Sequence, residues 1–266
     1  MSSLAFLKLG GSLITEKAQP STARHKLIRR LAGEIAQARD KDPNLRLVLG
    51  HGSGSFGHMA ARNHGTRTGV KSAEDWHGFA EVYSAAAALN KIIMQALEQC
   101  EVRAIAFPPS ASLLAREGQI ESWELKPIAH ALEAGLLPVV YGDVAFDLQR
   151  GGSIISTEEL FSFLTAEFQP THILLAGEVA GVFADFPQQA SLINNITPQS
   201  FGDFRAAIAG SVQTDVTGGM LSKVEAMLQL VQSAPGLEVR IFSGKEPGAI
   251  LKAIEGDELG TRIGRE

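Results

Sequence analysis

The sequence predicts an α/β fold with a mostly parallel sheet, and two observations predict it. Short apolar runs of strand length alternate with longer amphipathic runs of helical period along the whole chain. Turn-forming residues separate these runs, as at Gly135 and at Pro235-Gly236, where a helical pattern stops. Strands that alternate with helices form crossover units, which favour a parallel sheet covered by helices.

The elements follow one another in strict alternation. The first strand, 4–9, and the second, 45–50, are almost entirely apolar, and the first helix, 24–39, lies between them. A helix at 73–99, a strand at 102–107, a helix at 125–134 and a strand at 137–141 come next. They are followed by a helix at 157–168, a strand at 172–176, a helix at 219–233, a strand at 237–242 and a helix at 247–254.

The helix expected at 73–99 is the longest in the chain. Four consecutive alanines, Ala85 to Ala88, give it strong helix propensity. Apolar residues that include Phe79, Val82 and Leu89 recur at helical spacing, so one face is core, pocket wall or dimer surface.

Composition limits the classes of function. The chain has 266 residues, of which 45% are hydrophobic, and its net charge is −5, so no global positive field attracts nucleic acid or an anionic membrane. Cys100 is the only cysteine, which excludes an internal disulfide and suits a reducing cytosol. No signal-peptide pattern and no apolar run of roughly 20 residues occurs, so we expect a cytoplasmic protein.

The loops that suit phosphate fall into one set before residue 60 and another after residue 214. The simplest arrangement is two lobes that share one sheet. We expect the division near residue 168, with an N-terminal lobe of 1–168 and a C-terminal lobe of 169–266.

The first of these loops follows the first strand. Lys8 ends that strand, Gly10, Gly11 and Ser12 follow it, and Lys17 comes one loop later. Glycines let the backbone approach an oxygen closely, and two lysines would neutralise a triphosphate from two sides. A plain tight turn is the alternative, and the Gly-Lys-Ser/Thr of a Walker A loop is missing.

The second loop reads His51-Gly52-Ser53-Gly54-Ser55-Phe56-Gly57-His58 and follows the second strand. Backbone amides in such a loop can wrap an anion, and a histidine at its rim adds a donor. The alternative is a strand-to-helix turn with one histidine in the core. Zinc binding is disfavoured because no Asp, Glu or Cys lies nearby in sequence, so we expect no metal ligand from the protein.

The third piece, Thr214 to Lys223, enters a helix through Gly218-Gly219 and places Lys223 on its first turns. The free amides of a helix N-terminus and a nearby ammonium suit the outer phosphates of a nucleotide. In isolation, a solvated lysine after a helix cap would be the better interpretation.

Two acidic positions could organise these lysines. Asp143 follows a strand, and Glu158 opens a helix beside Glu159. A carboxylate fixed between lysines keeps them charged and aimed, although acids at a helix start are often only dipole complements.

These motifs, in this order and spacing, resemble the amino acid kinase family, and the extended loop ending in His58 resembles its isopentenyl phosphate kinase branch. The resemblance covers the chain from about residue 4 to Ile263. It implies a three-layer α/β/α sandwich, with an acceptor-binding N-terminal lobe and an ATP-binding C-terminal lobe, usually as a homodimer. It also implies transfer of a phosphoryl group from ATP, with Mg²⁺, to isopentenyl phosphate, with dimethylallyl phosphate as a related acceptor.

The resemblance further implies roles for single residues. Gly10, Gly11 and Ser12 would cradle the transferring phosphate, with Ser55 beside it, while Lys8, Lys17, Lys223, Gly218 and Gly219 would bind the phosphates of ATP. Ser53, Gly54, Gly142, Asp143 and His58 would contact the acceptor, and Phe79 and Val82 would wall its short isoprenoid tail.

The chain also departs from the family pattern. Ala176-Gly177-Glu178 stands where relatives often carry Thr-Asp, so we expect a hydroxyl and a carboxylate to be missing near the nucleotide. Two alternatives stay open, a kinase for fosfomycin or another small phosphate or phosphonate, and a non-catalytic protein of the same fold that stores or senses an anion.

Overall fold

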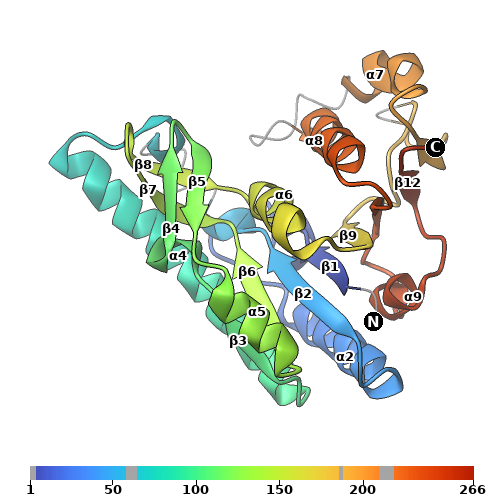
Figure 1. The fold of residues 1–266 in the computed structure, drawn as a ribbon, viewed down its shortest axis with the longest axis horizontal. Coiled ribbons are helices and arrows are strands. Elements are labelled where there is room, and N and C mark those ends of the chain that lie inside the picture. The colour runs from blue at the N-terminus through green and yellow to red at the C-terminus, as the bar shows by residue number, and fades with distance from the viewer. Residues whose placement is uncertain (1–3, 58–64, 186–187, 210–218) are drawn as a thin grey trace.

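The central feature of the computed structural model is a sheet of eight strands, in the order β10-β12-β11-β9-β1-β2-β6-β3 (Figure 1). The structure describes residues 4–57, 65–185, 188–209 and 219–266. All neighbouring strands are parallel except β11 and β12. The strands are β1 (Leu4–Leu9), β2 (Arg46–His51), β3 (Ala104–Ala106), β6 (Leu137–Tyr141), β9 (His172–Gly177), β10 (Asn195–Ile196), β11 (Glu238–Ser243) and β12 (Thr261–Ile263). The predicted α/β class with a mostly parallel sheet is confirmed.

Helices cover both faces of this sheet. On one face α2 packs against α4 and α9, and on the other α6 packs against α8. The helices are α1 (Gly11–Ile14), α2 (His25–Lys41), α4 (Ala73–Gln99), α5 (Lys126–Glu133), α6 (Thr157–Phe168), α7 (Phe201–Ala209), α8 (Gly219–Ser233) and α9 (Ala249–Glu255). The arrangement therefore has three layers.

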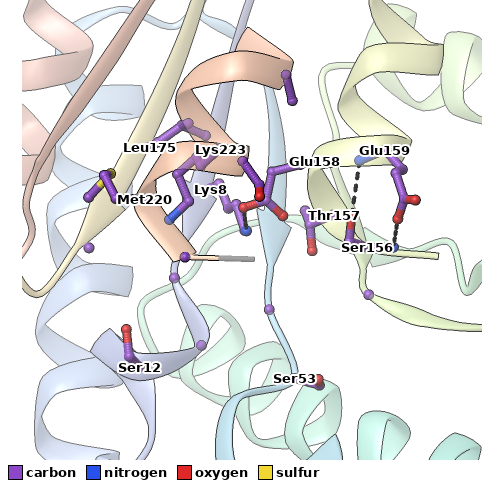
Figure 2. A pocket seen from close by; sticks show the side chains of 18 of the residues that line it. Lys8, Ser12, Ser53, Ser156, Thr157, Glu158, Glu159, Leu175, Met220 and Lys223 are labelled. Atoms are coloured by element: carbon purple, nitrogen blue, oxygen red, sulfur yellow. Dashed lines mark hydrogen bonds and ion pairs between the residues drawn. The ribbon is translucent and has the colours of Figure 1, made fainter. Parts of the chain in front are cut away.

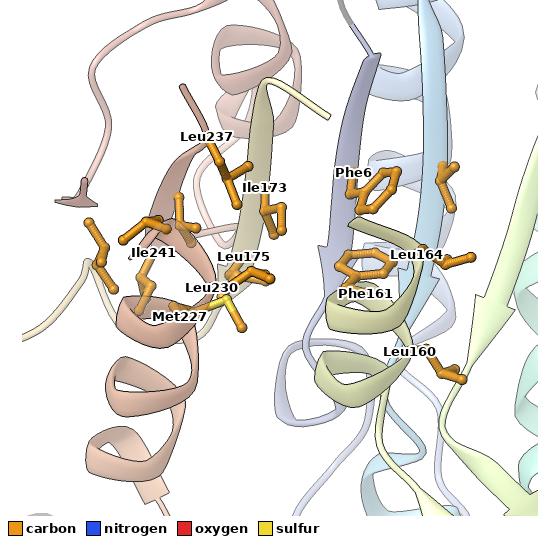
Figure 3. Packing of buried hydrophobic residues seen from close by; sticks show 14 of the residues in the cluster. Phe6, Leu160, Phe161, Leu164, Ile173, Leu175, Met227, Leu230, Leu237 and Ile241 are labelled. Carbon is orange, nitrogen blue, oxygen red and sulfur yellow. The ribbon is translucent and has the colours of Figure 1, made fainter. Parts of the chain in front are cut away.

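Strand β1 shows how the sequence builds these layers. Successive side chains of a strand point to opposite faces. Leu7 and Leu9 pack with α2, whereas Phe6 packs on α6, where its ring lies 5.0 Å from that of Phe161 (Figure 3). The same alternation turns Lys8 toward the face of Phe6, which is the face of α6 and α8.

A buried carboxylate joins α2 to α9. Glu34 of α2 accepts hydrogen bonds from the backbone amides of Gly248 at 3.0 Å and Ile250 at 2.8 Å, at the start of α9. Arg30, one turn earlier on α2, lies 2.6 Å from the same carboxylate. The first amides of a helix have no partner within it, so a carboxylate there satisfies them and complements the helix dipole.

The six predicted strands and six predicted helices are confirmed, with ends that differ by at most two residues, as for 24–39 against His25–Lys41. Strands from before and after residue 168 meet where β1 pairs with β9. The division into two functional lobes stays a prediction.

A second, four-stranded sheet was not predicted. Its order is β5 (Gln119–Trp123), β4 (Leu113–Arg116), β7 (Asp143–Asp147) and β8 (Gly151–Ile155), and α4 runs beside it (Figure 1). Asp147 holds its turns together, because its carboxylate accepts hydrogen bonds from four backbone amides in two turns, 117–118 and 149–150.

No helix in the described part of the chain has the length and apolarity that a membrane crossing requires.

Candidate active site

The candidate site is a cavity of about 1180 Å³ at the carboxyl ends of the central strands. The residues that follow β1, β2, β6 and β9 are Gly10, Gly52, Gly142 and Glu178, and all four line it. Open parallel sheets bind ligands at this edge because loops and helix N-termini converge there.

The first two predicted loops pack directly on each other. A side chain on Gly11 would place its Cβ 2.5 Å from the amide nitrogen of Gly54, whose φ of +50° itself favours glycine. Thr15 pins the pair, because its hydroxyl donates to the Gly11 carbonyl at 2.7 Å and accepts from the Ser55 amide at 2.9 Å. The glycines are therefore needed for a close backbone contact beside the cavity.

Backbone amides remain available in the first loop. The Gly10 amide donates to the Ala176 carbonyl at 2.8 Å, which fixes the loop to β9. The amides of Gly11 and Ser12 lie in the first turn of α1 and have no acceptor among the described residues. Gly11 and Ser12 both line the cavity, and their contact with a phosphate stays a prediction.

Lys8 and Glu158 form an ion pair at the centre of the site (Figure 2). Their side chains are only 10% and 20% exposed. Lys223 of α8 lines the same cavity and lies beside Lys8 (Figure 2). Burial alone would raise the pKa of Glu158, but the charges of Lys8 and Lys223 outweigh burial and hold this pKa at about 2. Glu158 is therefore ionised at neutral pH, paired with Lys8 and within range of the charge of Lys223.

The start of α6 fixes the position of Glu158. Ser156 and Glu159 form a capping box, in which the Ser156 amide donates to Glu159 at 2.6 Å and the Glu159 amide donates to the Ser156 hydroxyl at 3.2 Å. Between them, the Thr157 hydroxyl donates to the His51 carbonyl at 2.7 Å. The helix start is thus tied to the end of β2, and Glu158 projects toward Lys8.

Asp143 has different partners from those predicted. Its carboxylate accepts hydrogen bonds from the Ser110 hydroxyl at 2.7 Å and the Val144 amide at 2.8 Å. Burial raises its pKa to about 6, and lysine charges are not among the causes of the shift. Of the two acidic positions, Glu158 is the one that the structure brings to the lysines, although Asp143 and Gly142 both line the cavity.

Lys17 lies at the cavity beside Glu178, with its Nζ 3.7 Å from the Glu178 Oε2. Arg24 and Lys245 contact the other oxygen of this carboxylate, at 2.9 and 3.7 Å. Glu178 thus places a carboxylate at the cavity, while the absence of a carboxylate beside the nucleotide itself stays a prediction.

His51 is buried in the core. This agrees with the alternative interpretation of the loop 51–58, a turn with one of its two histidines in the core. Its ring stacks on Tyr141 at 5.1 Å, and its two nitrogens lie 3.2 Å from the Gly52 carbonyl and from the side-chain oxygen of Asn90. Burial lowers its pKa to about 4, with a smaller contribution from the charge of Lys8. The ring is therefore neutral at physiological pH and serves to position the loop.

The remaining predicted residues divide into two groups. Ser53, Gly54, Val82 and Gly219 line the cavity, whereas Ser55 and Phe79 do not. The Ser55 amide is taken by Thr15, and Phe79 packs in an apolar cluster with Val82. Two further predicted residues, His58 and Gly218, lie outside the described residues.

Sequence reasoning missed Thr15 and Arg67 at this site. Thr15 is buried and hydrogen-bonded to both loops, and Arg67 lines the cavity with its guanidinium 3.7 Å from Glu159. A threonine after a Gly-Gly-Ser turn carries no distinctive pattern, so only the fold reveals its role. Among the described residues, no group of three His, Cys, Asp or Glu side chains could hold a metal ion.

The fold and this site define an α/β protein with cationic side chains and free amides at the carboxyl edge of its sheet. Residues 3–243 match the model of the amino acid kinase family, and the chain belongs to that family. The resemblance found in the sequence is therefore confirmed.

Similar proteins carry a more specific name. The chain is 35% identical to an isopentenyl phosphate kinase of Methanothermobacter thermautotrophicus and 29% identical to one of Methanocaldococcus jannaschii, in each case over 98% of both chains. A solved isopentenyl phosphate kinase structure matches with a TM-score of 0.81 and 30% identity, over 98% of this chain and 99% of the other. A product complex of the Thermoplasma acidophilum enzyme shares the fold with a TM-score of 0.78 at 24% identity.

Proposed function

We propose that this chain is an ATP-dependent kinase that phosphorylates isopentenyl phosphate, giving isopentenyl diphosphate and ADP. The observation that carries the proposal is the buried ion pair of Lys8 and Glu158 at the carboxyl edge of the sheet, with Lys223 lining the same cavity. Full-length similarity to isopentenyl phosphate kinases supports the choice of acceptor.

The chemistry suits a site rich in cations. An oxygen of the acceptor phosphate forms a bond to the γ-phosphorus of ATP, and the bond from that phosphorus to the β,γ-bridging oxygen breaks, so the electron pair leaves with ADP. The acceptor oxygen is already anionic near neutral pH and needs no strong base. The protein's task is to bring two anions into line and to neutralise their charge.

On this proposal, the C-terminal lobe, 169–266, binds ATP and the central lysines serve the transferring group. Lys8, Lys17 and Lys223 offset its charge, the amides of Gly11 and Ser12 bind its oxygens, and Glu158 keeps the lysines in place. Mg²⁺ would be carried by the nucleotide phosphates, which supply the hard oxygen ligands that the ion prefers.

The N-terminal lobe, 1–168, binds the acceptor. Ser53, Gly54 and Gly142 lie beside the cavity where its phosphate would sit, and Val82 of α4 offers an apolar wall for the tail. His58, which lies outside the described residues, would donate a hydrogen bond to the acceptor phosphate. We also propose that the chain acts as a homodimer in the cytoplasm.

The test is a side-by-side assay of the purified chain with ATP and Mg²⁺. We expect ADP release that depends on isopentenyl phosphate, a product with the ³¹P spectrum of a diphosphate, and weaker turnover with fosfomycin. Dimethylallyl phosphate, added in parallel, measures selectivity for the position of the double bond. A preference for fosfomycin would favour the phosphonate kinase, and no ADP release with any acceptor would favour the anion-storage alternative. Light scattering on the same sample measures the oligomeric state.

A second measurement addresses the acceptor site alone. His58→Ala should lower kcat/KM for isopentenyl phosphate far more than it weakens ATP binding, because its proposed contact is with the acceptor only. An unchanged kcat/KM for the acceptor would contradict this role.

A further inference from the structure

Glu178 gathers three cations from two separate segments of the chain. Lys17 and Arg24 come from the stretch between α1 and α2, and Lys245 follows β11. Glu178 itself follows β9, and its side chain is 19% exposed. The cluster therefore links the loop after β1 to the carboxyl ends of β9 and β11.

The two oxygens of this carboxylate have different partners. Oε1 accepts a hydrogen bond from Arg24 at 2.9 Å and lies 3.7 Å from Lys245, whereas Oε2 lies 3.7 Å from Lys17. Arg24 is itself fixed, because its Nε and Nη2 lie 3.0 and 3.1 Å from the two oxygens of Glu16. A guanidinium held by two carboxylates is a rigid support, so Glu178 is held from one side and presents Oε2 on the other.

Lys17 and Lys245 provide an internal comparison. Both ammonium groups lie 3.7 Å from Glu178, and both side chains are half exposed or more, at 63% and 50%. Lys17 lines the cavity, and Lys245 is not among the residues that line it. An exposed lysine loses much rotamer freedom when it is held in one place, so a nearby carboxylate can decide where its ammonium resides.

We propose that Glu178 is a positioning residue that holds the ammonium of Lys17 at the cavity for use by the transferring phosphoryl group. The inference rests on the function proposed above. A separation of 3.7 Å is an ion pair without a short hydrogen bond, so Lys17 shifts to a phosphate without breaking a strong contact. Arg24, which donates a hydrogen bond to Oε1, remains to neutralise the carboxylate that Lys17 leaves.

Glu178→Gln is the informative substitution. The amide keeps an oxygen for Arg24 but removes the charge that faces Lys17. We expect kcat to fall by about tenfold with little change in the KM for isopentenyl phosphate, because the loss concerns the orientation of one charged group. Removing a negative charge would by itself favour an anionic nucleotide, so a faster enzyme would contradict the proposal.

The double substitution separates positioning from general damage. Lys17→Ala should lower kcat, and Glu178→Gln added to Lys17→Ala should cost little more, because the carboxylate has no lysine left to position. Glu178→Asp should recover part of the activity. Lys245→Ala is the matched control, which removes a cation at the same distance from Glu178, and it should leave kcat within about twofold of wild type.

The outcomes are distinguishable. A wild-type chain that does not phosphorylate isopentenyl phosphate removes the proposed function and this inference with it. An active wild type in which Glu178→Gln has no effect, or in which its effect simply multiplies that of Lys17→Ala, overturns the inference alone. An equal loss of kcat in Lys245→Ala and in Glu178→Gln also overturns the inference. Thermal melting of each variant, measured in parallel, shows whether the variant is folded.

Discussion

Two carboxylates at the cavity hold lysines in different ways. Glu158 makes a close ion pair with Lys8, and both side chains are largely buried. Glu178 stands 3.7 Å from Lys17 and from Lys245, whose side chains are half exposed or more. One lysine is fixed before any ligand arrives, and the other is kept near but able to move.

The difference follows from where each acid lies. Glu158 opens a capped helix that packs on the sheet, so its position is set by the core. Glu178 lies in a loop and is fixed by a partly buried contact with Arg24, and its two lysine partners are within reach of water and salt. We therefore expect the Glu158 site to carry the larger share of catalysis and to respond less to the solvent.

Lys8→Ala tests the buried pair most severely. Lys8 is preorganised, and its loss also leaves Glu158 with a single nearby ammonium. We expect kcat to fall by about 10²- to 10³-fold, the scale for removing one preorganised charge-stabilising group. Steady-state kinetics with both substrates measures it, with Lys245→Ala as a control, and an effect confined to KM would contradict a role at the transition state.

Glu158→Gln should have a smaller effect on the same site. Both lysines remain, but the negative charge that pairs with Lys8 and attracts Lys223 is lost. We expect kcat to fall by about tenfold, the lower end of the effect of removing a supporting partner. If Glu158→Gln were as active as wild type, the carboxylate would be only a complement to the helix dipole.

Salt sharpens the comparison further. The Glu178 cluster is exposed enough to be screened, since the Debye length falls from about 10 Å at 0.1 M to about 3 Å at 1 M salt. We expect the kcat ratio of wild type to Glu178→Gln to shrink by about twofold over this range, while the ratio for Glu158→Gln stays constant. Equal salt dependence of the two ratios would remove the distinction drawn here.

Acid stability gives the smallest effect. The pKa of Glu158 is about 2 in the folded protein against an ordinary 4.5, so the ionised side chain stabilises the fold above pH 4.5 and this contribution is lost as pH falls toward 2. Glu158→Gln should flatten this part of the dependence of unfolding free energy on pH, measured by urea denaturation.

Two other groups titrate in neighbouring ranges, so only the difference between wild type and variant isolates Glu158. His51, with its pKa lowered from 6.5 to about 4, also costs stability as pH falls through that range. Asp143, with its pKa raised from 3.8 to about 6, acts in the opposite direction. A pH dependence that is the same in Glu158→Gln and wild type would contradict the lowered pKa.

The sequence predicted the elements that carry their own signal. β1 is an apolar run and α4 has alanine-rich helical spacing, and both were placed to the residue. The second sheet was missed because its strands are short, and because two of them, β4 and β5, are largely exposed, with burial alternating residue by residue in β4. Its stability depends on long-range contacts such as those of Asp147, which no local pattern reveals.

The site was predicted in part for the same reason. Lys8, Gly11 and Ser12 follow a strong strand, so their place at the edge of the sheet could be inferred. The carboxylate partner of Lys8 depends on how α6 packs on the sheet. The sequence therefore could not decide whether Asp143 or Glu158 is that partner. Glu178 was interpreted only as a departure from a family pattern. Its position depends on a hydrogen bond from Arg24, which lies 154 residues earlier in the chain, so the sequence could not reveal it.

The contact of Glu34 with the start of α9 has a consequence for how the chain unfolds. Glu34 is 5% exposed and receives amides from a segment more than 200 residues away. If α9 frayed alone, this carboxylate would lose those donors while still enclosed by α2. Slow amide hydrogen exchange at Ile250 and Leu251 should therefore match that of the α2 interior, so that the last helix opens only when the whole molecule does.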